Sequence, residues 1–344
     1  MRMAALDHGL QIFSTCPVSA QTQPAAALRQ LEEIARWSED AGCEGMLVFT
    51  DNKQLDPWLV SQVVIKATKR LCPLVAVQPA YMHPYSVAKM VTSLGFLYGR
   101  RVHLNMVAGG FKKDLEALDD RTPHDERYAR LVEYTSIIQG LLRSADPLSF
   151  EGRYYKVSNL KLTPPLPADL RPEVLLSGSS EAGAQAARQL GATPVEYPKP
   201  PADYAGRPAN SAACGIRIGI IARYEDTEAW TEAHARFPED RKGQLTHQLA
   251  MQVSDSHWHR QLSELGNSGS PGANPYWLAP FQNYKAVCPY LVGSYDRVAD
   301  EVARYIDAGY RTFILEAPVS AEEMWHTGVV FERAVARCRL SAAA

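Results

Sequence analysis

The sequence predicts an α/β protein built on a (β/α)₈ barrel of the TIM type with insertions, in a single domain that spans residues 1–344. Short apolar runs alternate with stretches of helical period through the first two-thirds of the chain, which is typical of βα units around a parallel sheet. The apolar runs number eight, and a count of eight favours a closed barrel over an open sheet with polar edges.

The expected elements follow one another in a regular order. The first helix begins near Pro24, a favoured first helical residue, and ends at Gly42. The run at residues 214–223 is almost continuously apolar, which indicates a strand buried on both faces. The eight expected strands are residues 10–15, 45–50, 74–80, 102–110, 173–180, 192–197, 214–223 and 311–317.

Three segments depart from the simple alternation. We expect a hairpin insertion near residues 148–162, with Gly152 at its turn. The proline-rich residues 198–208 stand where a barrel usually carries a full helix, so one helix is expected to be missing or degenerate. The Gly/Ser/Pro cluster at residues 267–275 predicts an exposed or mobile loop near residues 265–285, which is either a lid that a bound ligand protects from protease or merely an exposed loop.

Composition excludes several classes of protein. The formal net charge of −2, with 22% charged residues, gives no reason to expect nucleic acid or an anionic membrane as partner. No apolar stretch reaches the roughly 18 residues that span a bilayer, so we expect a cytoplasmic protein. The six cysteines form no CxxC pair, which predicts buried free thiols. His257 and His259 lack a third ligand at metal spacing, so no metal site is expected.

In a barrel the functional groups lie just after the strands, and SGSSEAG (177–183) is the strongest such signal here. Gly178 allows a ligand to approach the backbone, and Ser179 and Ser180 precede a helix whose free N–H groups favour a phosphate. Ordinary N-capping by either serine explains the same pattern. Both interpretations stay open on the residues alone.

Other polar residues follow or interrupt apolar runs. Gln78 and Asn105 are candidates to hydrogen-bond a planar heterocycle or a polyol, or they face water. His124 and Tyr128 belong to a loop-to-helix junction, HDERY, where Thr122 or Asp125 is an expected cap. Arg217 lies within an apolar strand and needs either an anionic ligand or a structural carboxylate, since an unpaired buried charge is costly.

Taken together, several motifs in this order and spacing resemble the bacterial luciferase-like flavin monooxygenases, most of all the alkanesulfonate monooxygenase branch. The resemblance is close over residues 28–197 and looser over residues 216–331. The motifs that carry it are GRRVHLNMVAGG, HDERY, FEGRYYKV with NLKLTPPLP, SGSSEAGAQAARQLG and LVGSYDRVADEVARYIDAGYRTFIL.

The resemblance implies FMN as cofactor, used as FMNH₂ that a separate reductase supplies, with O₂ as co-substrate. By similarity Tyr128, Ser179 and Ser180 would hold the FMN phosphate, with Asn105 and His124 near the flavin or its ribityl chain; Gln78 is a further cofactor-binding candidate. A homodimer or homotetramer is expected by analogy.

Departures from the sulfonate branch bear on the substrate. Gln54 stands where that branch has a Cys, Gly219 where it has a His, and Pro318 replaces its Tyr after the last strand, while Arg217 is retained. Arg217 and Gln54 are therefore the catalytic candidates. We expect oxidation of a small or carrier-tethered organic substrate other than a simple alkanesulfonate. The alternatives are a deazaflavin-dependent oxidoreductase and a non-catalytic flavin-binding barrel.

Overall fold

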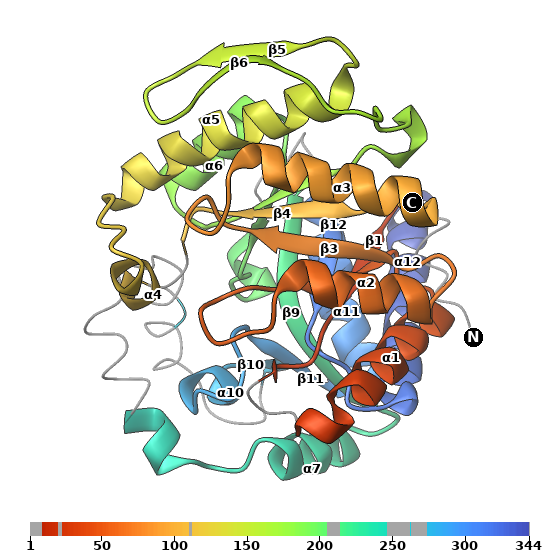
Figure 1. Cartoon of the computed structure of the whole chain (residues 1–344). Helices are drawn as coiled ribbons and strands as arrows, with labels where there is room; N and C mark the ends of the chain where they lie inside the picture. The colour runs from red at the N-terminus through yellow and green to blue at the C-terminus, as the bar shows by residue number, and fades with distance from the viewer. Residues whose placement is uncertain are drawn as a thin grey trace. The chain divides into compact units, whose positions relative to one another are not determined.

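The computed structural model describes residues 9–19, 23–109, 112–204, 214–245, 262 and 274–343 (Figure 1). The chain divides into two compact units, each made of more than one segment. The first unit comprises Met1–Thr15, Arg36–Glu44 and Val195–Ala344, and the second comprises Cys16–Ala35 and Gly45–Pro194. The expectation of a single domain stays a prediction, and the two units are described in turn.

The second unit contains a parallel sheet of four strands, in the order β2, β3, β4, β7. Every residue of β2 and β3 is buried, as expected for parallel strands that are covered on both faces. β2, β4 and β7 lie within runs that the sequence predicts, and β3 begins two residues before the predicted run 74–80. Their bounds are β2 (Gly45–Val48), β3 (Cys72–Val77), β4 (His103–Val107) and β7 (Val174–Ser177).

The helices of this unit begin where local sequence signals place them, with one exception. Asp56 caps α2 (Pro57–Ala67) by accepting hydrogen bonds from the backbone of Trp58 and Leu59, both at 3.0 Å. The expected cap of α5 (His124–Arg143) is wrong: its N-cap is Pro123 without a side-chain bond, because Thr122 bonds Asp120 instead. The remaining helices are α1 (Pro24–Ala41), α3 (Pro84–Tyr98), α4 (Lys112–Ala117) and α6 (Glu181–Leu190).

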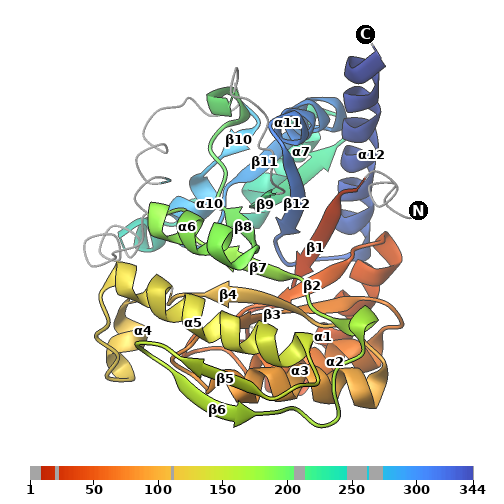
Figure 2. The same cartoon turned by 90° about the horizontal axis from the view of Figure 1, so that it is seen from above.

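An antiparallel hairpin interrupts the alternation after α5. Figures 1 and 2 show α5 between this hairpin and β4, and α5 contacts both. The Glu133 carboxylate on α5 accepts hydrogen bonds from the backbone N–H groups of residues 153–155 at 2.8, 2.8 and 3.1 Å. Glu133 therefore fixes the hairpin turn to the helix. The strands are β5 (Leu148–Glu151) and β6 (Lys156–Leu160), followed by the 3₁₀ helix η3 (Ala168–Leu170).

The first unit contains a sheet in the order β10, β11, β9, β12, β1. The ten-residue β9 pairs in parallel with β12 along its first half and with β11 along its second half, and the Val195–Glu196 end of β8 also pairs with it. The sequence predicts neither β10 nor β11. Their bounds are β1 (Gln11–Thr15), β8 (Thr193–Glu196), β9 (Cys214–Arg223), β10 (Tyr276–Trp277), β11 (Tyr290–Ser294) and β12 (Tyr310–Leu315).

Two irregular segments of the first unit are described in part. Within the expected mobile loop, residues 274–285 contain β10 and the short helix α10 (Ala279–Gln282), while residues 265–273 lie outside the described residues. Of the proline-rich segment, residues 198–204 hold only the 3₁₀ helix η4 (Pro201–Tyr204). The long helices are α7 (Asp226–Arg236), α11 (Tyr295–Asp307) and α12 (Ala321–Ala343), of which α11 packs against α12.

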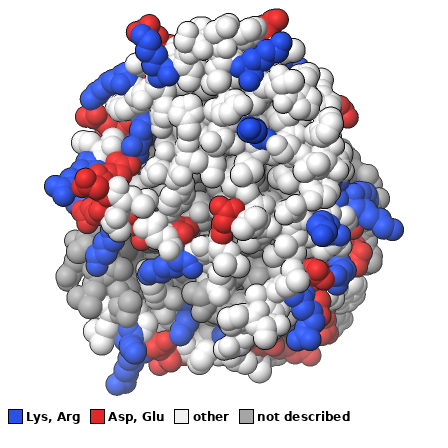
Figure 3. Space-filling model, in the orientation of Figure 1, with Lys and Arg blue, Asp and Glu red and all other residues white. Residues whose placement is uncertain are grey.

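The distribution of charged side chains and the state of the cysteines agree with what the composition predicts. Acidic and basic side chains are interspersed over the face drawn in Figure 3. All six cysteines are free thiols and five are buried, as expected, while Cys338 is half-buried. Among the described residues, no helix is both long and apolar enough to cross a membrane.

Candidate functional site

The start of α6 forms a compact cradle in the second unit. Tyr128, buried on α5, is hydrogen-bonded to Ser180 and lies directly against Gly178. A Cβ at Gly178 would lie 2.5 Å from the Tyr128 hydroxyl oxygen, so only glycine fits beneath the ring. Ser180 Oγ accepts the backbone N–H of Gly183 at 3.1 Å and so caps the helix. The N-capping interpretation is thus right for Ser180.

Ser179 differs from Ser180 in having no such role. Its Oγ is shielded from solvent and has no hydrogen-bond partner among the described residues. Buried polar groups are nearly always paired, so an unpaired hydroxyl beside the N-terminus of a helix calls for a partner. An oxygen-rich anion would accept from this hydroxyl and from the free N–H groups of the first turn. Helix capping by Ser180 and phosphate binding by Ser179 are therefore compatible, because they involve different serines.

The ionisation state of Tyr128 suits the same ligand. Burial raises the pKa of Tyr128 above its ordinary value, and the hydrogen bond with Ser180 only partly offsets this effect. The hydroxyl therefore keeps its proton at neutral pH and remains a hydrogen-bond donor. The ring of His124 stands edge-on to Tyr128 at 5.3 Å between centroids, and its Nδ1 lies 2.7 Å from Asp125 Oδ1. The predicted residues His124, Tyr128, Ser179 and Ser180 therefore lie around one helix start.

Asn105 lies in β4, and Gln78 directly follows the neighbouring strand β3. Ser177 Oγ donates to Asn105 Oδ1 at 2.9 Å, which links β4 to the strand that leads into Ser179. Asn105 lies in the middle of β4 rather than at its end. Gln78 follows β3 directly, is buried, and hydrogen-bonds Tyr81. Asn105 thus connects to the cradle, whereas Gln78 is seen with Tyr81 alone.

The two catalytic candidates lie in different units. Gln54, in the second unit, accepts the backbone N–H of Ser19 through Oε1 at 2.9 Å, and Ser19 Oγ in turn accepts the backbone N–H of Leu55. Gln54 therefore fixes the chain after β1 to the segment before α2. These contacts describe a structural tie, and a catalytic role for Gln54 stays a prediction.

Arg217, in the first unit, has a carboxylate partner. Its Nη2 lies 3.0 Å from Oε1 of Glu316, the residue just past β12. The register explains this pairing, because Arg217 is opposite Ile314 and the two-residue strand period puts Glu316 on the same face. Burial disfavours the charged form, but Glu316, Tyr197 and Cys288 together more than offset it and hold the pKa of Arg217 above its ordinary value. The alternative of a structural carboxylate is the one observed.

Two further residues form hydrogen bonds with the members of this ion pair. Tyr197, just past β8, is hydrogen-bonded to Arg217, and burial raises its pKa to about 12. The Cys288 thiol donates to Glu316 Oε1 at 3.2 Å, and burial together with that carboxylate raises the pKa of Cys288 well above its ordinary value. Sequence reasoning missed Glu316, Tyr197 and Cys288. The position of Glu316 directly after an apolar strand was the one signal that pointed to it.

Gly219, where the sulfonate branch has a histidine, is covered by another side chain. Gly219 pairs with Tyr290 of β11, and a Cβ on Gly219 would lie 2.4 Å from the Tyr290 ring. The buried Tyr290 ring therefore occupies the space beside this position. The unpredicted strand β11 thus supplies the side chain that lies beside Gly219, two residues from Arg217 along β9.

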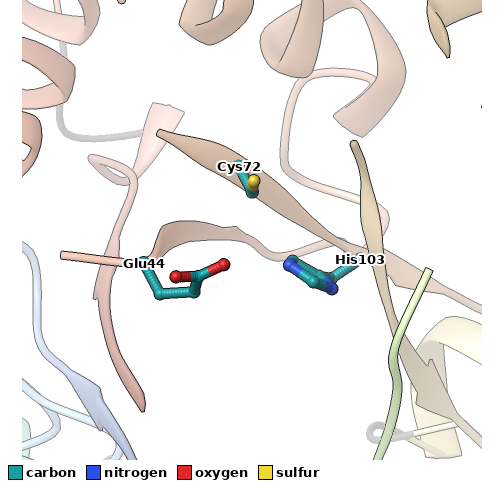
Figure 4. Close-up of side chains that lie close together, drawn as sticks. All are labelled: Glu44, Cys72 and His103. Atoms are coloured by element: carbon teal, nitrogen blue, oxygen red, sulfur yellow. The ribbon is translucent and has the colours of Figure 1, made fainter. Parts of the chain in front are cut away.

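Two side chains of types that can bind a metal ion lie close together at the amino ends of strands in the second unit's sheet. Cys72 and His103 are the first residues of β3 and β4 (Figure 4), and Cys72 Sγ lies within 4.8 Å of a ring nitrogen of His103. His103 Nδ1 accepts the backbone N–H of Glu173 at 3.2 Å. These contacts tie β4 to the segment before β7, and they lie at the amino ends of the strands, opposite the cradle.

The cradle has the donors that an oxygen-rich anion would need, and sequence comparison gives the family. The model of the luciferase-like monooxygenase family matches residues 10–312. The chain therefore belongs to the luciferase-like monooxygenases, and its fold is the (β/α)₈ barrel of that family, as predicted.

One curated relative is similar over nearly its whole length. The 4-(gamma-L-glutamylamino)butanoyl-[BtrI acyl-carrier protein] monooxygenase BtrO of Niallia circulans is 36% identical over 338 residues, which cover 96% of this chain and 98% of the relative.

Solved structures show the same fold at low identity. Long-chain alkane monooxygenase LadA matches with a TM-score of 0.71 and 17% identity over 97% of this chain and 92% of that one. Riboflavin lyase RcaE, solved with modified FMN and riboflavin, matches with a TM-score of 0.67 and 17% identity over the same shares. F420-dependent enzymes are also among the structures that match.

Proposed function

We propose that this protein is an FMNH₂-dependent monooxygenase that uses O₂ to oxidise an acyl substrate tethered to a carrier protein, with reduced flavin supplied by a separate reductase. The cradle at the start of α6 carries the proposal for the cofactor. It offers one buried hydroxyl with no partner among the described residues, and one protonated tyrosine that the absence of a side chain at Gly178 allows to lie against the backbone. The similarity to BtrO supports the carrier-bound substrate.

The cradle suits a phosphate monoester better than a neutral group. Ser179 Oγ, the Tyr128 hydroxyl and the first-turn N–H groups of α6 all donate, and the helix dipole adds positive potential at the same end. Hydrogen bonds to a charged acceptor are about twice as strong as neutral ones. These residues would hold the phosphate of FMN, and the Asn105–Ser177 bond would orient the polar chain between phosphate and ring.

The reaction divides between cofactor and protein. Reduced FMN, when bound, supplies the electrons that activate O₂. The chain's own residues position the cofactor by its phosphate and bind the substrate. Burial of Tyr128 and of the Ser179 and Ser180 hydroxyls limits their contact with water, which strengthens polar contacts to a bound phosphate. Neither Gln54 nor Arg217 is assigned proton transfer, because both are engaged with other groups.

The substrate class follows from the relative and from Arg217. BtrO acts on a 4-(γ-L-glutamylamino)butanoyl group on its carrier protein. In this chain Glu316 neutralises Arg217, so a simple anion such as a sulfonate has no unpaired cation to bind there. A carrier-bound acyl group with a γ-glutamyl-type end is therefore the proposed substrate.

We also propose that the protein is a homodimer or homotetramer. Helices α2 and α3 contact each other and expose large apolar side chains, with Leu59, Phe96 and Leu97 each about two-thirds exposed. A second copy that covers this face would bury apolar surface that is otherwise in water. Light scattering of the purified protein tests the assembly, and Phe96→Asp should shift a dimer towards monomer.

Oxygen labelling tests the function directly. Carrier protein loaded with 4-(γ-L-glutamylamino)butanoate is incubated with the enzyme, FMN, a flavin reductase, NADH and ¹⁸O₂. The proposal expects one ¹⁸O atom in the released acyl group, and no product when the reductase or FMN is omitted. Product formation with reduced deazaflavin in the absence of O₂ would instead favour the hydride-transfer alternative. Tight flavin binding without any labelled product would favour the non-catalytic one.

A further inference from the structure

The Arg217–Glu316 pair has unused hydrogen-bonding capacity. Arg217 Nη2 and the Cys288 thiol both address Oε1 of Glu316, at 3.0 and 3.2 Å. Glu316 Oε2 has no hydrogen-bond partner among the described residues, and the side chain is 20% exposed. The Arg217 side chain is 13% exposed. Each of the two side chains therefore keeps a small part of its surface accessible.

The charges of this pair select among ligands. A lone anion would approach Glu316 as well as Arg217, and a lone cation would approach Arg217 as well as Glu316, so neither gains from the pair as a whole. A zwitterion has an ammonium for Glu316 and a carboxylate for Arg217. Its net charge of zero also leaves the neutral pair balanced, which matters because an unpaired charge in a poorly hydrated site is costly.

Apolar residues next to the pair suit the rest of such a ligand. Tyr197 bonds Arg217 and also packs against a buried cluster of Leu262, Leu278 and Phe281. An acyl chain that ends in a zwitterion would place methylene groups along an apolar surface and its charged end at Arg217 and Glu316. A ligand without the charged end would leave the accessible polar atoms unpaired.

We propose that Arg217 and Glu316 together recognise the free α-amino-acid group at the end of the acyl substrate. The ammonium donates to Glu316 Oε2, and the carboxylate accepts from the accessible guanidinium of Arg217. A hydrogen bond from Cys288 holds the Glu316 side chain in place, and a hydrogen bond with Tyr197 holds that of Arg217. This inference rests on the proposed function, because it specifies the substrate of that function.

Equilibrium binding measurements test this recognition of the α-amino-acid group without requiring turnover. Three pantetheine thioesters are titrated into the protein by calorimetry, anaerobically, with and without reduced FMN and with no reductase. The first carries 4-(γ-L-glutamylamino)butanoate, the second lacks its α-amino group, and the third lacks its α-carboxylate. Loss of one charge-assisted hydrogen bond should weaken binding by about ten-fold or more for each truncated probe. Affinities within two-fold of one another, or no binding of any probe, would overturn the proposal.

Variants of Glu316 and Arg217 test recognition of the amino group and of the carboxylate separately. Glu316→Gln should abolish the preference for the amino group and keep that for the carboxylate, and Arg217→Met should do the reverse. The double variant leaves no unpaired charge, so it should fold and lose both preferences. Glu322→Gln and Arg304→Met, at exposed positions of the same unit, are matched controls that should change neither preference.

Binding and turnover separate this inference from the proposed function. If the preferences are present but no ¹⁸O enters the acyl group, the proposed function fails while the recognition site stands. If labelled product forms equally from all three probes, the function stands and the recognition site is refuted.

Discussion

Replacement of Ser179 by alanine should change cofactor affinity and protein stability in opposite directions. In the free protein Ser179 Oγ is buried and unpaired among the described residues. An unsatisfied buried polar group costs about 1–3 kcal/mol, so Ser179→Ala should leave the free energy of unfolding unchanged or raise it by up to that amount. The same change removes a donor to the phosphate, and a hydrogen bond to a charged group contributes about 1.5–3 kcal/mol. Affinity for reduced FMN should therefore fall by about 10- to 100-fold.

Ser180→Ala is the matched comparison in this experiment. Ser180 caps α6 through the N–H of Gly183, and loss of an N-cap costs about 1 kcal/mol of stability. The neighbouring serines should therefore differ in the sign of their effect on the flavin-free protein, measured by urea unfolding, while both weaken FMN. Riboflavin, which lacks the phosphate, should bind Ser179→Ala and wild type alike. Equal losses of FMN and riboflavin affinity, or a clear destabilisation by Ser179→Ala, would refute the assignment of Ser179 to phosphate.

Three further changes test other contacts. Gly219→Ala should destabilise the protein by about 1–3 kcal/mol through overpacking against Tyr290, and unchanged urea midpoints would show that the ring moves freely. Glu133→Gln should free the hairpin turn, seen as faster tryptic cleavage after Arg153; equal rates in both proteins would speak against the anchor. Glu232 has its pKa lowered mainly by the hydrogen bond from Arg236, so its contribution is present above the ordinary carboxyl pKa and lost as pH falls through the folded value. Glu232→Gln should thus lower stability at pH 7 and converge with wild type in acid, whereas a constant difference would contradict the shift.

Much of the fold was predictable because barrel strands are locally encoded. The eight apolar runs overlap the strands β1 to β4, β7 to β9 and β12, although β3 and β12 begin before their runs, since parallel strands buried on both faces need continuous apolar sequence. Pro24 and Gly42 bound the first helix for reasons of backbone conformation. β10 and β11 escaped prediction because two- and five-residue strands give little periodicity, and their pairing with β9 is a long-range contact.

The candidate site was predictable only where its residues are neighbours in the sequence. Ser179 and Ser180 adjoin a helix start, so strand, glycine and serines in sequence indicated a candidate anion site there, whereas Tyr128 was added only by the family resemblance. Glu316 and Cys288 meet Arg217 through the register of β9 and β12 and the segment before β11, which no local pattern encodes. The interpretation of Arg217 as a free anion contact could therefore be decided only in three dimensions.

Anaerobic titration of the purified protein with FMNH₂, with reduced riboflavin and reduced deazaflavin as comparators, tests the central claim most directly. The account predicts saturable binding of FMNH₂ that is at least ten-fold tighter than binding of reduced riboflavin, with a smaller difference in Ser179→Ala, which keeps the Tyr128 and first-turn N–H donors. No binding of FMNH₂, or equal affinity for FMNH₂ and reduced riboflavin, would contradict the assignment of the α6 cradle as the phosphate site of a flavin monooxygenase.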